Sequence, residues 1–345
     1  MTTPRYPAPL TAGARLFVAA PSSGVPAPLW PRLELVLGHL RQQGFVVEEG
    51  SLLRKRGEGA SGPAAERAAE LMQALLRDDI AAVLPPWGGE LAIELLDLLD
   101  WDAIARSKPK WFVGFSDLST LMLPLLLRAG WASVHGPNLM DRAPRQSDRL
   151  TVASLELLGL APGQSLEQSS SERWQSGGTD FKDQPDSTFA LTEPTRWWAL
   201  NGEPHVLARG RVLGGCLDTW MHLVGTPYGD VPGWHAEHAA DGCLLWLENC
   251  ELRPPTVVRA LKQLRYAGWL DGLSALLLGR SSAPATEMED LSYEQALRQS
   301  LSGLSCPVLV DVDFGHQSPQ MSIVQGAMAE LEWSPSGARL LQTLC

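Results

Sequence analysis

The chain has 345 residues, of which 45% are hydrophobic and 19% are charged, and its formal net charge at pH 7 is −11. This composition is typical of a soluble globular protein, and the length favours two domains over one. The acidic balance, with no basic run to follow a phosphate backbone, argues against nucleic-acid binding, and no apolar run reaches the roughly 18 residues of a membrane span.

In the first 160 residues, short apolar runs alternate with stretches of helical periodicity. The predicted strands span residues 15–20, 45–47, 80–84, 111–113 and 132–134, and the predicted helices span 30–41, 64–77, 91–99 and 118–128. Strands that alternate with helices predict a parallel sheet covered by helices. Such sheets bind ligands at the carboxyl ends of their strands, where the loops 21–24 and 87–90 and the turn at Ser116 should meet.

A polar stretch follows a predicted helix over residues 150–160. Residues 161–187 are rich in Ser, Gln, Gly and Asp, which is typical of a linker or a long surface loop. Trp174, Trp197 and Trp198 lie in or beside this stretch, either as a lid over a ligand or docked onto a second domain. We therefore expect an N-terminal domain over residues 1–160, a linker and tryptophan-bearing loop over 161–200, and a C-terminal domain over 201–345.

The predicted C-terminal domain contains more strands than the N-terminal domain, and their alternation with helices is less regular. The predicted strands are 206–212, 244–247, 275–278, 308–312, 322–324 and 329–333, and the predicted helices lie near 217–224, 256–267 and 293–301. This pattern predicts a mixed, partly barrel-like α/β domain.

The turn at Ser116 is the most distinctive feature of the first half. The apolar run Trp111–Val113 ends at Gly114, and a leucine-rich helical pattern begins at Leu118. A sharp turn from strand to helix would expose the Ser116 hydroxyl at the sheet edge as a nucleophile. Local sequence favours the other interpretation, in which Ser116 only caps the helix. The second glycine of a G-x-S-x-G pattern is absent, because Leu118 stands in its place, so the motif alone is weak.

The glycine pair Gly88-Gly89 has two interpretations. Glycines between a strand and a helix usually form a tight turn. They also let backbone N–H groups approach a reacting oxygen, as an oxyanion hole requires. No G-x-G-x-x-G sequence occurs, so this pair is not a dinucleotide-binding fingerprint.

A serine nucleophile needs a general base and a group that orients the base. His316 follows the apolar run 308–312 in a loop without a packing pattern, His135 lies near Ser116 in sequence, and His222 falls in a leucine-rich helix that suggests a structural role. Glu248 closes the apolar run 244–247. A carboxylate there is costly to bury unless it is paired, for example with an imidazole N–H.

Cysteine usage and the N-terminus bear on the compartment. The five cysteines are an odd number without a Cys-x-x-Cys pair, which indicates reduced thiols rather than disulfides or zinc ligands. The N-terminal residues contain no apolar signal core. We therefore expect a cytoplasmic protein that needs no metal.

Several short motifs occur in a fixed order along the chain: Pro85-Pro-Trp-Gly-Gly89, Val113-Gly-Phe-Ser-Asp117, His135-Gly-Pro137, Gly214-Gly-Cys-Leu217, Gly225-Thr-Pro-Tyr228, Leu245-Trp-Leu-Glu248 and Phe314-Gly-His316. This series resembles the LD-carboxypeptidase family of serine peptidases. The resemblance implies a flavodoxin-like N-terminal domain, a smaller β-rich C-terminal domain and a homodimer.

The same resemblance implies the roles of particular residues. Ser116, Glu248 and His316 would form a catalytic triad, and the backbone N–H groups of Gly89 and Asp117 would form the oxyanion hole. No organic cofactor would be required. The candidate substrate contacts are Trp87, Gly88, His135 and Trp197.

Three functions stay open. The first is an LD-carboxypeptidase that releases D-alanine from the tetrapeptide stem of muropeptides. The second is a detoxifying peptidase of the MccF branch, which acts on microcin C-type aminoacyl-nucleotide adducts. Trp87 and Glu90, which stand where many members have arginine and tyrosine, and the inserted stretch 161–200 favour that branch. The third is a non-catalytic protein that binds a peptide or nucleotide on the same scaffold.

Overall fold

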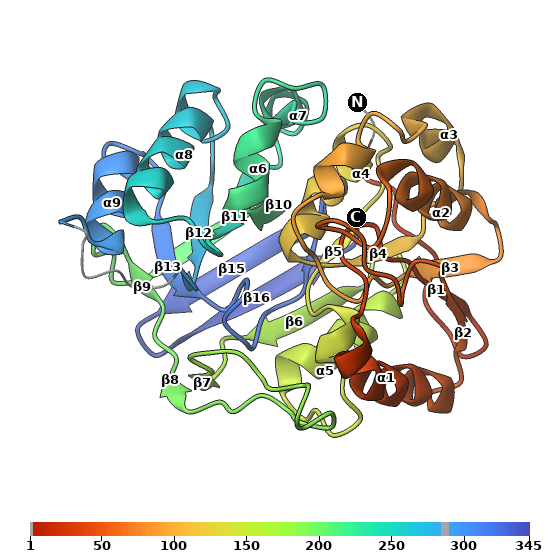
Figure 1. Ribbon diagram of the computed structural model, residues 1–345. Helices are drawn as coiled ribbons and strands as arrows, with labels where there is room; N and C mark the ends of the chain where they lie inside the picture. Colours follow the sequence, from red (N-terminus) through yellow and green to blue (C-terminus); the bar gives the residue numbers. More distant parts are fainter. Residues whose placement is uncertain (1–2, 284–289) are drawn as a thin grey trace.

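The computed structural model describes residues 3–283 and 290–345, which form two large β-sheets with helices packed on them and one two-stranded ribbon (Figure 1). The first sheet has the strand order β14-β5-β4-β3-β1-β2. Its strands are β1 (Arg15–Val18), β2 (Val46–Glu49), β3 (Ile80–Val83), β4 (Trp111–Gly114), β5 (Val134–His135) and β14 (Ile323–Val324). All neighbours pair in parallel except β14, which is antiparallel to β5. The predicted parallel N-terminal sheet is confirmed.

Helices cover this sheet as the alternating pattern predicts. They are α1 (Trp30–Gln42), α2 (Ala64–Leu76), α3 (Trp101–Arg106), α4 (Ser119–Leu127) and α5 (Arg149–Leu158). The predicted helix 91–99 is instead a short 3₁₀ turn, η2 (Ala92–Leu95), that precedes α3.

Helix α4 lies between the two halves of the molecule. All nine of its residues are buried, because it packs on its own sheet and also against strand β10 of the second sheet. An apolar surface all round is what such a position requires. Ser119, its first residue, accepts a hydrogen bond at Oγ from the Cys216 N–H and at its carbonyl from the Trp220 indole. The helix that follows Ser116 is thus anchored to the C-terminal half.

The second sheet has the strand order β6-β16-β15-β10-β11-β12-β13-β9. Its strands are β6 (Ser165–Ser169), β9 (Trp198–Ala199), β10 (Val206–Cys216), β11 (Cys243–Glu248), β12 (Ala275–Gly279), β13 (Val308–Val312), β15 (Met328–Ser334) and β16 (Gly337–Thr343). Strands β10 to β13 are parallel and the flanking strands are antiparallel. The predicted β-rich second half is confirmed, as an open sheet with ends at β6 and β9 where we expected a partly barrel-like one.

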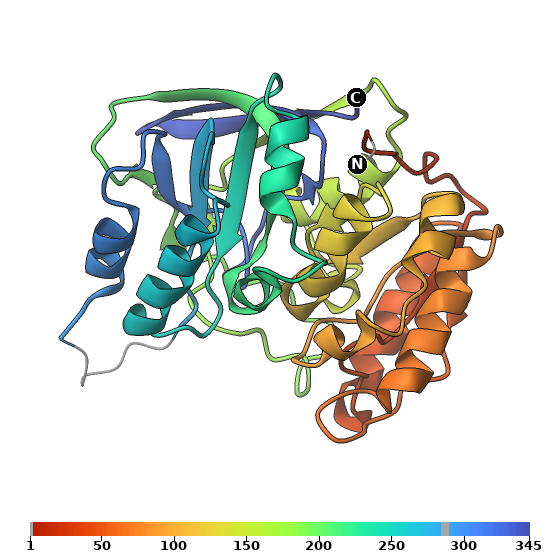
Figure 2. The ribbon, with the colours of Figure 1, turned by 90° about the horizontal axis from the view of Figure 1, so that it is seen from above.

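Helices of the second half lie on one side of this sheet (Figure 1). They are α6 (Leu217–Trp220), α7 (Val231–Glu237), α8 (Pro254–Tyr266) and α9 (Tyr293–Leu301), and the 3₁₀ turn η5 (Met221–Leu223) follows α6. Figure 2 shows the red-to-orange N-terminal half and the green-to-blue C-terminal half side by side. Within the described ranges, no helix is both long and apolar enough to cross a membrane.

The segment 161–200 differs from the expected linker and loop. Its strand β6 pairs with β16, its strand β9 pairs with β13, and β7 (Arg173–Trp174) pairs with β8 (Glu193–Pro194) in a separate ribbon. Conversely, β14 belongs to the C-terminal part of the sequence but pairs with β5 in the first sheet. The expected division at residues 160 and 200 is therefore crossed by strand pairing in both directions.

Candidate active site

Ser116 occupies a strained turn at the carboxyl end of β4. Its φ angle is 65°, a left-handed conformation that L-residues with a side chain seldom adopt and that costs about 1–3 kcal/mol. The short turn η3 (Ser116–Leu118) then leads directly into α4. The capping position of that turn belongs to Phe115, and its side chain makes no capping bond. The Ser116 hydroxyl is thus free for another partner.

That partner is His316. The Ser116 Oγ lies 3.0 Å from His316 Nε2, and His316 Nδ1 lies 2.8 Å from Glu248 Oε2. Glu248 is the last residue of β11, and His316 lies in the loop after β13. Residues that are 200 and 68 positions apart in the chain therefore form one hydrogen-bonded row. A hydroxyl, an imidazole and a carboxylate in this order can transfer a proton from the hydroxyl to the ring.

Two glycines make room for Glu248 beneath the histidine. A Cβ atom on Gly315 would lie 2.6 Å from Glu248 Oε2, and the φ angle of Gly315 is 99°. A Cβ atom on Gly279 would lie 3.0 Å from Glu248 Cβ and still closer to the carbonyl oxygen of Phe314. Only glycine fits at either position without displacing the carboxylate or the loop.

Electrostatics favour a charged pair at Glu248 and His316. Burial raises the pKa of the Glu248 carboxyl, but the attraction and hydrogen bond of His316 outweigh it and hold that pKa below 4.5. Burial lowers the pKa of His316, but the charge of Glu248 outweighs it and the pKa of His316 lies well above 6.5. The carboxylate therefore makes the imidazole a stronger base.

The glycine pair after β3 touches the Ser116 turn. A Cβ atom on Gly88 would lie 2.8 Å from the backbone nitrogen of Asp117 and 3.0 Å from Ser116 Oγ. Gly89 has a φ angle of 151° and packs against the side chains of Ser22 and Ser23. This brings the loop that carries the predicted Gly89 N–H beside the predicted Asp117 N–H.

The side chain of Asp117 is used for structure. Its carboxylate accepts hydrogen bonds from the Ser22 hydroxyl at 2.6 Å, the Ala92 N–H at 2.8 Å and the Thr120 hydroxyl at 3.3 Å. Burial raises the pKa of this carboxyl. These bonds fix the peptide that follows Ser116.

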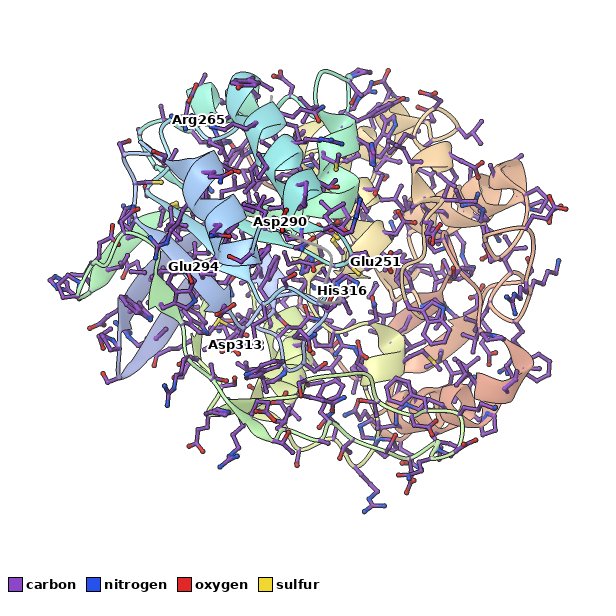
Figure 3. All side chains as sticks on the ribbon, turned by 60° about the vertical axis from the view of Figure 1, so that its left-hand side comes forward. Glu251, Arg265, Asp290, Glu294, Asp313 and His316 are labelled. Carbon is purple, nitrogen blue, oxygen red and sulfur yellow. The ribbon has the colours of Figure 1, made fainter. Side chains whose placement is uncertain are left out.

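Two cavities open on either side of the Ser116 hydroxyl, and both are lined by Gly89, Ser116 and His316. The first, of about 600 Å³, is also lined by Ser23, Gly24, Pro26, Arg56, Gly57, Gly59, Ala60, Trp87, Gly88, Phe115 and Asn138. The second, of about 480 Å³, is also lined by Glu90, Ile93, Asp117, Thr120, Cys216, Asp218, Thr219, His222, Cys250 and Glu251. Figure 3 shows His316 and Glu251 close together near the middle of the molecule. A substrate could thus extend in two directions from the serine.

Of the four candidate substrate contacts, Trp87 and Gly88 line the first cavity, and the structure corrects the other two. His135 has no exposed surface, stacks on Phe314 with ring centroids 4.1 Å apart, and has its pKa lowered to about 3 by burial. Trp197 is only 6% exposed, and its indole N–H donates to the buried Asp313 carboxylate at 3.1 Å. Both lie beneath the site and face neither cavity.

The other two tryptophans, for which a lid over a ligand was one of two alternatives, also lie elsewhere. Trp198 donates its indole N–H to Asp311 at 2.8 Å, and the Arg280 guanidinium lies over the Trp174 ring at 5.4 Å. Neither ring lines the two cavities within the described residues.

Sequence reasoning missed other residues of the cavities. His222, expected to be structural, is exposed and lines the second cavity, because the helix α6 ends at Trp220. Arg56 and Asn138 line the first cavity. Asn138 follows the His135-Gly-Pro motif closely, which could have drawn attention to it, whereas nothing in the pattern around Arg56 distinguishes it from a solvated loop arginine.

Comparison with known proteins places the chain. The LD-carboxypeptidase N-terminal domain matches residues 17–136, and the LD-carboxypeptidase C-terminal domain matches residues 209–331. The chain belongs to the LD-carboxypeptidase family of serine peptidases. It is therefore a hydrolase, as the resemblance of its motifs predicted.

Individual relatives match along most of the chain. A Streptomyces coelicolor protein provisionally named a carboxypeptidase is 34% identical over 331 residues, which is 94% of this chain and 93% of that one. The murein tetrapeptide carboxypeptidase of Pseudomonas aeruginosa is 25% identical over 330 residues, 92% and 93% of the two chains. The solved structure of the microcin C7 self-immunity protein MccF has a TM-score of 0.81 at 23% identity, covers 98% of both chains and establishes the shared fold.

Proposed function

We propose that this protein is an LD-carboxypeptidase that releases D-alanine from muropeptide tetrapeptides, with Ser116 as nucleophile. The observation that carries the proposal is the hydrogen-bonded row from Glu248 through His316 to Ser116, in a chain whose family is that of LD-carboxypeptidases. Both cavities meet at this hydroxyl, which gives the two sides of a scissile amide separate places.

The reaction begins at the serine. Neutral His316 accepts the hydroxyl proton at Nε2 while Ser116 Oγ forms a bond to the amide carbonyl carbon. The carbonyl oxygen becomes an oxyanion, held by the N–H groups of Gly89 and Asp117. Removal of one such donor costs about 3–4 kcal/mol of transition-state stabilisation. Glu248 keeps the ring oriented and stabilises its protonated form.

The second half of the reaction returns the proton. His316 donates it to the leaving amine as the carbon–nitrogen bond breaks, which leaves an acyl ester on Ser116. Water, deprotonated by His316, then attacks the ester carbonyl and releases the acid, and the proton on His316 returns to the serine oxygen. Each step uses only the three side chains, the two N–H groups and water.

The charges of the first cavity support a carboxypeptidase. A carboxypeptidase substrate ends in a carboxylate next to the bond that breaks. Arg56 lines this cavity, and no acidic side chain lines it among the described residues. We therefore place the terminal carboxylate of D-alanine there.

The alternative is a peptidase of the MccF branch. Solved structures of MccF include complexes with aspartyl sulfamoyl adenosine and glutamyl sulfamoyl guanosine. Trp87 lines the first cavity of this chain and could stack on a nucleobase. This observation favours an aminoacyl nucleotide as the second candidate substrate.

Mass spectrometry of both reactions separates the candidates. The purified protein is incubated with a muropeptide tetrapeptide and, in parallel, with a microcin C-type aminoacyl nucleotide. Release of D-alanine supports the first proposal, and release of the nucleotide moiety alone would replace it with the second. Ser116→Ala should lose at least about 10³-fold in kcat while it keeps its thermal stability.

Covalent labelling of Ser116 by a serine-directed reagent tests the non-catalytic alternative. Labelling at Ser116 that requires His316 would exclude a protein that only binds its ligand, whereas no labelling and no turnover would favour it. The homodimer and the cytoplasmic location are also proposals, which light scattering and cell fractionation can test.

A further inference from the structure

The loop that carries His316 is fixed by a buried arginine. Arg280 is the residue that follows β12, and its Nη1 lies 2.6 Å from Asp313 Oδ1. The side chains of Arg280 and Asp313 are 5% and 0% exposed. Its Nη2 donates to the carbonyl oxygens of Gln317 at 3.0 Å and Pro319 at 2.9 Å. One guanidinium therefore binds the chain on both sides of His316.

The segment 161–200 binds the same carboxylate from the other side. Asp313 Oδ1 accepts from the Ser171 hydroxyl at 2.6 Å, and Oδ2 accepts from the Ser171 N–H at 2.7 Å and from the Trp197 indole at 3.1 Å. The N–H of Gln175 donates to the Ser318 carbonyl of the same loop at 2.8 Å. Figure 3 shows Asp313 below His316, near the green chain of this segment.

This network has no direct access to a substrate. Asp313, Arg280, Ser171 and Trp197 are absent from the described linings of both cavities. A buried ion pair stabilises a fold little compared with apolar packing, unless its geometry is specific. Here both carboxylate oxygens and both terminal guanidinium nitrogens have hydrogen-bond partners from three separate segments, and only the buried Nε of Arg280 has none among the described residues. Such an arrangement selects one position of the loop between them.

We propose that Asp313, Arg280, Ser171 and Trp197 form a positioning clamp that holds His316 against Ser116. The clamp makes the segment 161–200 a determinant of turnover although none of its tryptophans faces the cavities. This inference rests on the proposed role of His316 as general base. A shift of the reacting atoms by about 1 Å can cost about 10²-fold in rate, so a modest loosening of this loop should be measurable.

Two neighbouring tryptophans provide a matched test. Trp197→Phe removes the indole bond to Asp313. Trp198→Phe removes the equivalent indole bond to Asp311, whose carboxylate forms no hydrogen bond to residues 313–319 in the described part of the chain. We expect Trp197→Phe to lower kcat about 10-fold with KM within about twofold, and Trp198→Phe to stay within about twofold of wild type in both. The double variant Ser171→Ala/Trp197→Phe should lose more than either single one.

The pH dependence distinguishes positioning from general destabilisation. A loosened loop weakens the contact of His316 with Glu248, so the acid-side inflection of kcat/KM should move to lower pH in Trp197→Phe and not in Trp198→Phe. Thermal unfolding of both variants provides the stability control. Arg280→Lys, which keeps the charge but cannot bind Asp313 and two carbonyls in the same way, should behave like Trp197→Phe.

The clamp is overturned if the two tryptophan variants have the same kcat and inflection, or if the loss of kcat follows the melting temperature alone. Failure of the proposed role of His316 as general base has a different signature, because His316→Ala would then keep its activity. Inactive His316→Ala together with an unaffected Trp197→Phe would reject only the clamp.

Discussion

Glu248 and His316 carry opposite charges over a defined range of pH. The pKa of Glu248 is held below 4.5 and the pKa of His316 well above 6.5. The stabilisation due to Glu248 is present above its unfolded pKa and is lost as the pH falls through the lowered one. The stabilisation due to His316 is complete below its unfolded pKa and is lost as the pH rises through the raised one. The resting pair is therefore most stable between these limits.

The proposed mechanism has the opposite requirement, because His316 must be neutral to accept the proton of Ser116. Below the raised pKa of His316, kcat/KM should fall about tenfold per pH unit, with its inflection above pH 6.5. Glu248→Gln removes the charge that raises this pKa, so the inflection should move to lower pH while kcat falls. Initial rates across the pH range measure both effects. An inflection at the same pH in both proteins would contradict the electrostatic argument.

Gly315 allows a second test at the scale of one residue. Gly315→Ala forces a Cβ atom to within 2.6 Å of Glu248 Oε2, in addition to the cost of a side chain at a φ angle of 99°. We expect kcat to fall at least about 10²-fold and the free energy of unfolding to fall by at least about 1 kcal/mol. Steady-state kinetics and denaturant unfolding measure the two quantities.

Gly303→Ala is the matched control. Gly303 has a φ angle of 72°, and the nearest atom to its Cβ position is the flexible Arg265 guanidinium at 3.8 Å. This variant should lose stability by a similar conformational cost and keep its kcat. Equal activity of the two variants would show that the space beneath His316 is not needed.

Among the elements, the alternation of strands and helices in the first half was predictable because apolar runs and helical periods follow each other clearly. Strand β10 was predicted only as far as residue 212 but extends to Cys216. Its glycines look like a turn in the sequence, yet they allow close packing, since a Cβ atom on Gly214 would collide with the backbone and Cβ of Trp246, and one on Gly215 would collide with the ring of Trp220. Trp246 belongs to the neighbouring strand β11 and Trp220 to the helix that follows β10, and the alternation of apolar residues reveals neither contact.

Strands β6 and β9 were missed for a different reason. Edge strands expose most of their side chains, so the sequence of Ser165–Ser169 is as polar as that of a loop. The residues of the candidate site also differ in how far the sequence identifies them. Ser116 and Glu248 each follow an apolar run and could be selected from the sequence, and the family resemblance paired them with His316. The partners of Asp313 carry no such signal, because Ser171, Trp197 and Arg280 meet it only in the folded chain.

The whole molecule places the site between the two halves, with cavities of different charge on either side of the serine. Arg56 lies in the first cavity, and Glu90, Asp218 and Glu251 lie in the second. This distribution of charge would orient a substrate so that its terminal carboxylate lies in the first cavity.

Arg56→Ala tests this orientation of the substrate. If Arg56 binds the terminal carboxylate, its loss should raise KM for the tetrapeptide about 10-fold and change kcat little, because the contact is made in ground state and transition state alike. Steady-state kinetics with the tetrapeptide and with its C-terminal amide measure this. Lys55→Ala, the adjacent exposed cation outside the cavity, is the control. Equal KM values for Arg56→Ala and wild type would contradict the placement of the terminal carboxylate in this cavity.

The antiparallel pairing of β14 with β5 has a consequence for synthesis on the ribosome. β5 forms at residues 134–135, but its neighbour Ile323–Val324 is translated almost at the end of the chain. Until then the first sheet has an open edge one strand away from β4, which leads into the Ser116 turn. His316 emerges only a few residues before β14. The serine proposed as nucleophile is therefore synthesised 200 residues before the histidine proposed as its base. The segment that brings this histidine also supplies β14, so one late stretch of chain completes both the first sheet and the hydrogen-bonded row.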